Sequence, residues 1–128
     1  MNAEAAAAGL DATRYANPAG LDHPAQHSSA ADVVRLARGL MQDTAFRNIV
    51  AAESTTIDGS RLPTTNDLLG AYPGADGIKT GYTDEAGWCL AASATRDGRR
   101  VIVVVLGAPT EHARDDAARA LLDYGFSA

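Results

Sequence analysis

The chain has 128 residues, of which 46% are hydrophobic and 21% are charged. This length and balance predict one globular domain with its own core and exclude a disordered chain. The formal net charge of −5 argues against a nucleic-acid-binding protein, which would need a basic surface. The single cysteine cannot form an internal disulfide, and no Cys/His cluster has zinc-ligand spacing, so we expect neither a metal nor another cofactor.

The N-terminal segment, up to Leu10, is rich in alanine and predicts a short helix that stops at Gly9. It is too short for a membrane span, lacks a basic flank and contains Glu4, so we do not expect a signal peptide in this segment either. A loop rich in Pro, Gly and Asn follows over residues 15–24. Its length predicts either a functional role or a loop packed by its own side chains.

Two capped helices are expected next. Ser29 precedes Asp32 by three positions, which is a capping-box pattern with Asp in place of Glu. Asp43 is the expected cap of a second, shorter helix. The helical period predicts that the first helix buries Val33, Leu36, Ala37, Leu40 and Met41, and that the second buries Phe46, Ile49 and Val50.

The second half of the chain predicts antiparallel strands. Asp58-Gly59 is a hairpin turn between two short strands. Three longer strands are expected over 76–81, 88–95 and 100–106, and their short connections force antiparallel pairing. The β-branched run from Val101 to Leu106 predicts a strand covered on both faces, as a central strand is.

A last helix is expected after the strands, capped by Thr110 and stopped by Gly125. Its predicted inward stripe consists of Ala113, Ala117, Leu121 and Tyr124.

Lys79 is the only lysine in the chain, and it lies on a strand between glycines. Glycines in a strand let a ligand approach the backbone closely, and an ammonium beside the hydroxyl of Thr80 suits an anionic substrate. Lys-Thr-Gly is also a motif of penicillin-binding proteins and class A β-lactamases. Taken alone, Lys79 would more often be an exposed lysine that protects a sheet edge.

Several further blocks accompany this motif in order along the chain: Asn17–Asp22, Gln26–Ala30, Thr65–Leu69, Asp76–Gly81, Ala86-Gly87, Arg99–Gly107 and Arg114. Together they resemble the C-terminal half of a D-alanyl-D-alanine carboxypeptidase, a low-molecular-mass penicillin-binding protein. The resemblance implies a partial β-lactamase/DD-peptidase fold of the α/β class (α+β type). An antiparallel sheet of three C-terminal strands would pack with helices, including a C-terminal helix. Residues 1–128 would be the C-terminal portion of a single catalytic domain.

The resemblance implies a serine-type enzyme that removes the terminal D-Ala from peptidoglycan stem peptides through an acyl-serine intermediate. Lys79 would shape the electrostatics beside the nucleophile and help to bind the substrate. Thr80 would hydrogen-bond the terminal carboxylate, and Gly81 would let the strand lie against the substrate backbone. The backbone N–H of Tyr82 would be an oxyanion-hole donor.

Arg114 would attract the substrate carboxylate, because a guanidinium suits a planar carboxylate. The alternative for this residue is a solvated helix arginine that pairs with Glu111 one turn back.

Two motifs of the family are absent. No Ser-x-x-Lys occurs, because the residue three positions before the only lysine is Asp76. No Ser-x-Asn occurs either. In a variant of this motif Tyr replaces Ser, and Tyr15-Ala16-Asn17 has that form. It lies, however, in a loop where the family does not keep its catalytic motif. We therefore expect the chain alone to be inactive. A split or truncated gene, or a domain completed by another chain, would explain the missing motifs.

The missing portion would also leave an apolar strand edge and one apolar sheet face open. The expected partners are therefore an N-terminal complementing chain or a second copy, and, in the complete domain, peptidoglycan stem peptides and β-lactams. The resemblance implies an extracytoplasmic location. Two alternatives stay open: a non-catalytic remnant that binds carboxylates or penicillins, and a part of a serine β-lactamase.

Overall fold

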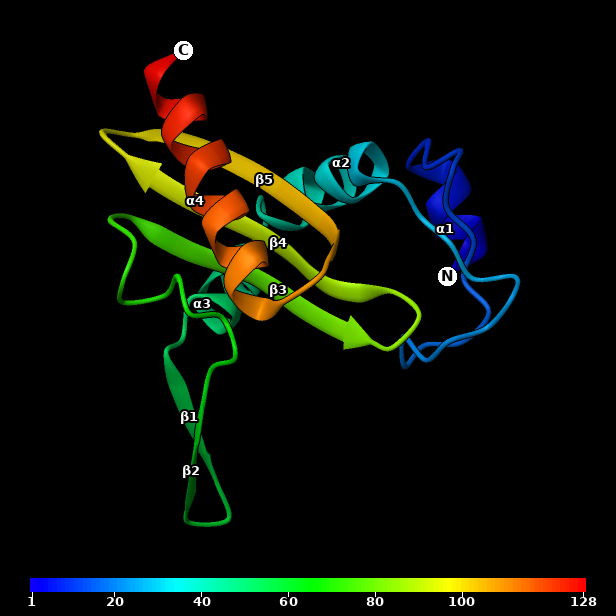
Figure 1. The fold of residues 1–128 in the computed structure, drawn as a ribbon, viewed down its shortest axis with the longest axis horizontal. Coiled ribbons are helices and arrows are strands. Elements are labelled where there is room, and N and C mark those ends of the chain that lie inside the picture. The colour runs from blue at the N-terminus through cyan, green and yellow to red at the C-terminus, as the bar shows by residue number, and fades with distance from the viewer.

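The computed structural model describes all residues from Met1 to Ala128. In chain order the elements are α1 (Asn2–Ala7), α2 (Ala30–Leu40), α3 (Thr44–Val50), β1 (Ser54–Ile57), β2 (Ser60–Pro63), β3 (Ala75–Thr83), β4 (Gly87–Arg96), β5 (Arg99–Ala108) and α4 (Glu111–Ser127). β3, β4 and β5 form one antiparallel sheet in that order, and β1 and β2 form a separate hairpin (Figure 1). The predicted three-stranded antiparallel sheet is therefore confirmed. No helix has the length and apolar character needed to cross a membrane.

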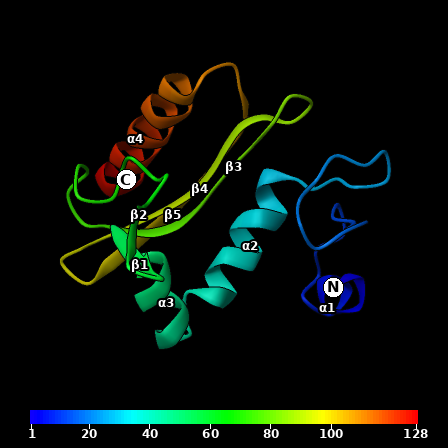
Figure 2. The same ribbon diagram turned by 90° about the horizontal axis from the view of Figure 1, so that it is seen from below.

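Helices cover both faces of the sheet, with α4 on one side and α2 and α3 on the other (Figure 2). Val101, Val103 and Val105 of β5 belong to the core beneath α4. Ile102 and Val104 face the opposite way and pack with the core beneath α2 and α3. This alternation explains the unbroken apolar run, since both faces of the strand meet apolar neighbours.

The central strand is β4, and β5 lies at an edge of the sheet. The expected open strand edge is therefore confirmed, and the residues from Val101 to Val105 meet apolar neighbours on both faces. The expectation of one uncovered sheet face holds only in part, because α2 lies against β5. Ile102 and Val104 remain half-buried there, and Leu106 is 45% exposed.

The predicted helix caps are confirmed. Ser29, Asp43 and Thr110 each accept a hydrogen bond from the backbone N–H three residues later. The carboxylate of Asp32 does not complete a capping box. It accepts instead from the backbone N–H of Ala12 at 2.9 Å and from the hydroxyl of Thr13 at 2.7 Å, and so ties α2 to the N-terminal segment.

The loop over 15–24 is packed by its own side chains. Asn17 Oδ1 accepts from the backbone N–H groups of Ala19 and Leu21, both at 3.1 Å. Asp22 accepts from the hydroxyl of Thr83 at 2.6 Å, so the loop reaches the end of β3.

The predicted helix faces are wrong at several residues. Phe46 and Val50 of α3 pack against the core as predicted, whereas Leu40 of α2 is 40% exposed. Ile49 of α3 is 74% exposed, although the pattern assigned it to the core. The inward stripe of α4 is shifted by one residue, which turns a helix by about 100°. Leu121 and Tyr124 are exposed, and the buried residues are Arg114, Asp115, Ala118 and Leu122. Hydropathy missed this stripe because it contains two charged residues that neutralise each other.

Gly125 does not stop α4, which continues to Ser127. A Cβ atom at this position would lie 2.5 Å from Cγ1 of Val101. The glycine therefore serves the close approach of α4 to the sheet.

We expect Gly125→Ala to lower the free energy of unfolding by about 1–3 kcal/mol, because the added methyl group overpacks the contact with Val101. Gly39→Ala in α2 is the matched control, since no atom lies within 4 Å of its Cβ position. That variant should gain about 0.5–1 kcal/mol from helix propensity. Urea unfolding of both variants measures the difference, and equal stabilities would contradict the packing argument.

Candidate active-site wall

The strand β3 presents an open edge. It pairs only with β4, so alternate backbone N–H and C=O groups point away from the sheet. Lys79 and Gly81 are exposed, and no atom lies within 4 Å of the position that a Cβ of Gly81 would occupy. The Lys79 ammonium donates to the carbonyl of Thr80. A ligand can therefore lie directly against this part of the backbone.

Cross-strand register assigns the predicted site residues to the two faces of the sheet. Thr80 is opposite Leu90, which packs beneath α4. Lys79 is opposite Ala91, which packs on the side of α2 and α3. Because directly opposite residues share a face, Thr80 lies on the face that carries Arg114, the residue near the start of α4.

A turn before β3 holds Thr80 and the beginning of the strand. The hydroxyl oxygens of Thr80 and Thr65 lie 2.6 Å apart. Asn66 is buried, donates from Nδ2 to the carbonyl of Gly77 at 3.1 Å and accepts from the backbone N–H of Leu68 at 3.2 Å. The sequence placed Thr65 and Asn66 in a resembling block but gave them no role.

Tyr82 and Trp88 form an aromatic pair at the other end of β3. They are cross-strand partners, and their ring centroids lie 4.4 Å apart. The Tyr82 hydroxyl donates to Asp84 at 2.7 Å, and this hydrogen bond and the carboxylate charge raise the pKa of Tyr82. Tyr82 is 52% exposed and Trp88 is half-buried, so the pair forms part of the surface.

Arg114 is buried, with only 1% of its surface exposed. Its Nε donates to Asp115 at 2.7 Å, and its Nη2 donates to Glu111 at 3.3 Å. Burial lowers the pKa of Arg114, but the hydrogen bond to Asp115 and the charges of Asp115, Glu111 and Asp67 outweigh burial and raise it. The alternative of a solvated Arg114 is therefore wrong, because the side chain is buried. The pair with Glu111 that this alternative predicted is confirmed.

Trp88 connects Arg114 to the strand. The guanidinium carbon lies 5.6 Å from the centroid of the Trp88 ring, against which Tyr82 also packs in a tilted arrangement. Thr80, Tyr82 and Arg114 thus belong to one region, although no direct contact joins Arg114 to Thr80. The strand register would have indicated Trp88, since it pairs with the residue that follows Lys-Thr-Gly.

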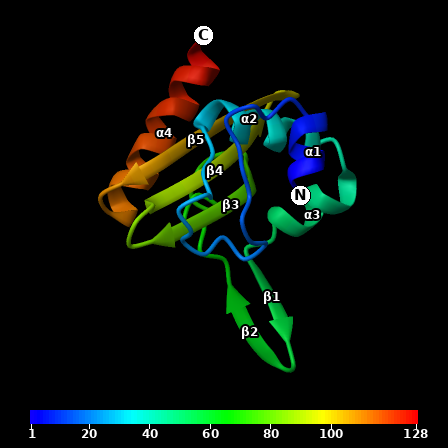
Figure 3. The same cartoon turned by 90° about the vertical axis from the view of Figure 1, so that its right-hand side faces the viewer.

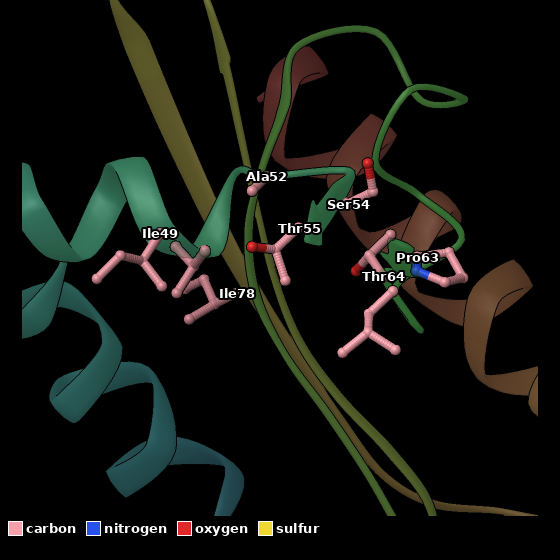
Figure 4. Close-up of a pocket in the computed structure, with 9 residues that line it drawn as sticks. Ile49, Ala52, Ser54, Thr55, Pro63, Thr64 and Ile78 are labelled. Carbon is pink, nitrogen blue, oxygen red and sulfur yellow. The ribbon is translucent and has the colours of Figure 1, made fainter. Parts of the chain in front are cut away.

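We call the exposed part of β3 over residues 79–82 the wall. A cleft of about 450 Å³ lies beside it, between α3, the β1–β2 hairpin and the start of β3 (Figure 4). Ile49 and Ile78 line one part of it, and Ser54, Thr55 and Thr64 contribute hydroxyls. No ionisable side chain lines the cleft. It offers no acid, base or charged anchor, so the exposed wall over 79–82 is the better candidate for chemistry.

Asp76 lies just before the Lys-Thr-Gly residues. Its Oδ2 accepts from the Thr95 hydroxyl at 2.8 Å and from Arg100 Nη2 at 3.0 Å. Burial raises the pKa of Asp76, but the nearby hydroxyls of Ser93 and Thr95 and the Arg100 guanidinium outweigh burial and hold it below its ordinary value.

We expect this carboxylate to make the fold sensitive to acid. Its pKa is lower in the folded chain, so the ionised form stabilises the fold above roughly pH 4 and this contribution is lost as the pH falls through the folded pKa. Asp76→Asn should therefore be less stable than the parent chain at neutral pH, and the difference should shrink in acid. Chemical denaturation over this range tests the prediction, with Asp97→Asn in an exposed turn as control. A difference that does not vary with pH would contradict it.

Solved structures similar to this chain include a DD-transpeptidase and a penicillin-binding protein. The crystal structure of a Streptomyces DD-transpeptidase has a TM-score of 0.95 and 34% identity, and the match covers 100% of this chain and 53% of that one. Penicillin-binding protein D2 of Listeria monocytogenes, in its cefotaxime-bound form, has a TM-score of 0.90 and 36% identity over 98% of this chain and 53% of its own. The chain therefore has a partial DD-peptidase fold, as the sequence predicted.

The family model for D-alanyl-D-alanine carboxypeptidase matches residues 1–110. The carboxypeptidase DacF of Bacillus subtilis is 39% identical over 135 residues, and a carboxypeptidase of Streptomyces sp. is 34% identical over 137 residues. Each match covers 99% of this chain. The chain belongs to the D-alanyl-D-alanine carboxypeptidase family. It spans 34% of the first relative and 47% of the second.

Proposed function

We propose that residues 1–128 are the C-terminal portion of a single catalytic domain that removes the terminal D-Ala from peptidoglycan stem peptides. The observation that supports this most is the open edge of β3, with the Thr80 hydroxyl beside Thr65, in a chain 39% identical to a D-alanyl-D-alanine carboxypeptidase. The chain contains no Ser-x-x-Lys. The nucleophilic serine and its base would therefore come from residues outside it.

Thr80 would bind the terminal carboxylate of the substrate. A hydroxyl has one proton and two acceptor positions. If Thr65 donates to Thr80 across their 2.6 Å contact, the proton of Thr80 is free for the carboxylate. Thr65 would thus orient Thr80, while the free edge of β3 pairs with the peptide backbone as an added strand.

Arg114 would supply the positive charge for the same carboxylate. A guanidinium has five N–H donors, and two of these are engaged. Asp115 holds Nε at 2.7 Å and its side chain is only 10% exposed. Glu111 contacts Nη2 at 3.3 Å and its side chain is 45% exposed. A substrate carboxylate would displace Glu111, whereas Asp115 would stay and fix the guanidinium.

The backbone N–H of Tyr82 would stabilise the reacting carbonyl oxygen. When the serine oxygen attacks the carbonyl carbon of the peptide bond, the serine proton passes to the base. Negative charge then develops on the carbonyl oxygen. Loss of one such donor typically costs 10²–10³ in kcat. The C–N bond then breaks, D-Ala leaves with the proton, and water hydrolyses the acyl-serine ester. Lys79 would raise the positive potential on the side of the serine.

A DD-transpeptidase is the second candidate, because that is the name of a solved structure 34% identical to this chain. The wall formed by β3 would serve carboxypeptidation and transpeptidation equally, since both reactions begin with acylation of the serine. The two reactions differ in the second step, in which water accepts the acyl group in the carboxypeptidase and an amine accepts it in the transpeptidase. Product analysis with an added acceptor amine distinguishes them in the complete protein.

We infer that the complete domain binds β-lactams and acts outside the cytoplasm. The Listeria relative is described in a cefotaxime-bound form, which supports the first inference. The stem-peptide substrate supports the second, because it belongs to the cell wall. The non-catalytic remnant and the β-lactamase predict other outcomes when the complete protein is treated with a labelled penicillin.

We expect the isolated 128-residue chain to form no covalent adduct with a fluorescent penicillin and to release no D-Ala from a D-Ala-D-Ala peptide. Protein expressed from the complete locus, with any coding sequence upstream, should do both. Labelling is read on a denaturing gel and D-Ala by enzymatic assay. A labelled isolated chain would place the nucleophile within these residues and contradict the proposal. Unlabelled complete protein would favour the remnant, and rapid release of the penicillin would favour a β-lactamase.

Three substitutions in the complete protein test the carboxylate site. Thr80→Val should lower kcat/KM about tenfold to a hundredfold, because it removes a hydrogen bond to a charged group. Glu111→Gln should instead lower KM, because the competing carboxylate is gone. Asp116→Asn is the matched control, since Asp116 is exposed on the same helix and pairs only with His112, at 3.1 Å. A raised KM in Glu111→Gln would refute the displacement of Glu111.

A further inference from the structure

The strand β3 contains an extra residue just before the Lys-Thr-Gly wall. Ala75 is opposite Ala94 and Gly77 is opposite Ser93, so Asp76 has no partner of its own on β4. Such a β-bulge shifts the register of everything that follows it. Because side chains alternate between faces, a shift by one residue exchanges the two faces of the strand.

The bulge determines the face on which Thr80 lies. With Asp76 bulged, Thr80 is opposite Leu90 and shares the face that carries α4 and Arg114. If the bulge were lost and the register before it continued, Thr80 would be opposite Cys89 and on the other face. Its hydroxyl would then be separated from the turn of Thr65 as well.

The carboxylate of Asp76 is bound by residues of both other strands of the sheet. It accepts from Thr95 of β4 at 2.8 Å and from Arg100 of β5 at 3.0 Å. Arg100 also contacts the Thr95 hydroxyl through Nε at 3.2 Å. The side chains of Asp76 and Arg100 are 23% and 29% exposed, so this pair is better shielded from water than a surface pair.

Two further contacts anchor the cluster outside the sheet. Arg100 Nη1 donates to the carbonyl of Met41 at 3.3 Å, at the C-terminal end of α2. Asn66 binds the carbonyl of Gly77 from the other direction at 3.1 Å. The residue that forms the bulge and the residue after it are therefore both fixed.

Ser93 of β4 completes the polar surroundings of Asp76. It is opposite Gly77 and fully buried, and its hydroxyl lies near the Asp76 carboxylate and helps to lower the pKa of Asp76. A buried polar cluster of this kind favours one strand pairing, because another register would leave its members without partners.

We propose that Asp76 and Arg100 are a positioning pair that locks the bulge of β3 and thereby sets the register of Lys79, Thr80 and Tyr82. The pair is assigned a role through the register of the strand and not through contact with substrate. Its role in the reaction rests on the proposed function, because it decides whether Thr80 faces Arg114. Its role in register does not depend on that function.

Nuclear magnetic resonance of the isotope-labelled chain tests the register directly. The parent chain should show cross-strand contacts of Thr80 with Leu90. In Asp76→Asn, a second set of contacts should appear, in which Thr80 meets Cys89. Asp97→Asn, in the exposed turn between β4 and β5, is the matched control and should keep the parent pattern. If folded Asp76→Asn retains only the parent contacts, the proposal is wrong.

A second variant covers the case in which Asp76→Asn does not fold. Arg100→Gln removes the ion pair from the β5 side and leaves Asp76 its hydrogen bond with the Thr95 hydroxyl. It should show the shifted contacts as a smaller fraction. Retention of the parent register alone in this variant would likewise overturn the proposal.

Kinetics in the complete protein test the positioning role. Asp76→Asn should lower kcat/KM at least tenfold at a temperature where the variant is folded, and Asp97→Asn should leave it unchanged. A shifted register with unchanged kcat/KM would refute the role in catalysis. If the complete parent protein has no activity, the proposed function fails, whereas the magnetic resonance result still decides the register.

Discussion

The central strand β4 is the constraint on which the rest of this structure depends. Every residue from Leu90 to Ala94 is buried, because helices lie on both faces of the strand. Most of these residues are small, which lets α4 on one side and α2 on the other come close. β3 has no other partner strand, so β4 determines the position and register of the residues of the candidate site on β3.

A pair of opposite charges lies near each end of the candidate wall. Asp76 and Arg100 meet where β3 begins, and Arg114 with Asp115 lies against Trp88, the cross-strand partner of Tyr82 near the other end of β3. Burying a charge is costly unless a partner compensates it, so each arginine is held in one place by its carboxylate. Between these fixed ends, the exposed backbone of Lys79 to Tyr82 is presented in one defined orientation.

Local signals in the sequence predicted the elements well, and long-range packing limited the rest. Ser29, Asp43 and Thr110 cap helices as expected, since capping depends only on residues three positions apart. The inward face of α4 was missed, because only the folded chain shows that Arg114 and Asp115 satisfy each other. The site residues came from resemblance, whereas the bulge at Asp76 depends on pairing between distant strands, which no local pattern contains.

The β1–β2 hairpin projects from the body of the molecule, away from the sheet (Figure 1, Figure 3). Apart from Ser54, every residue of its two strands is exposed, and its tip is the tight turn at Asp58 and Gly59. An element that buries so little contributes little to the cooperative unit, so its opening is governed by its own few hydrogen bonds. The tip is therefore a natural attachment point for a spectroscopic label, at the far end of a hairpin whose base lines the cleft beside β3.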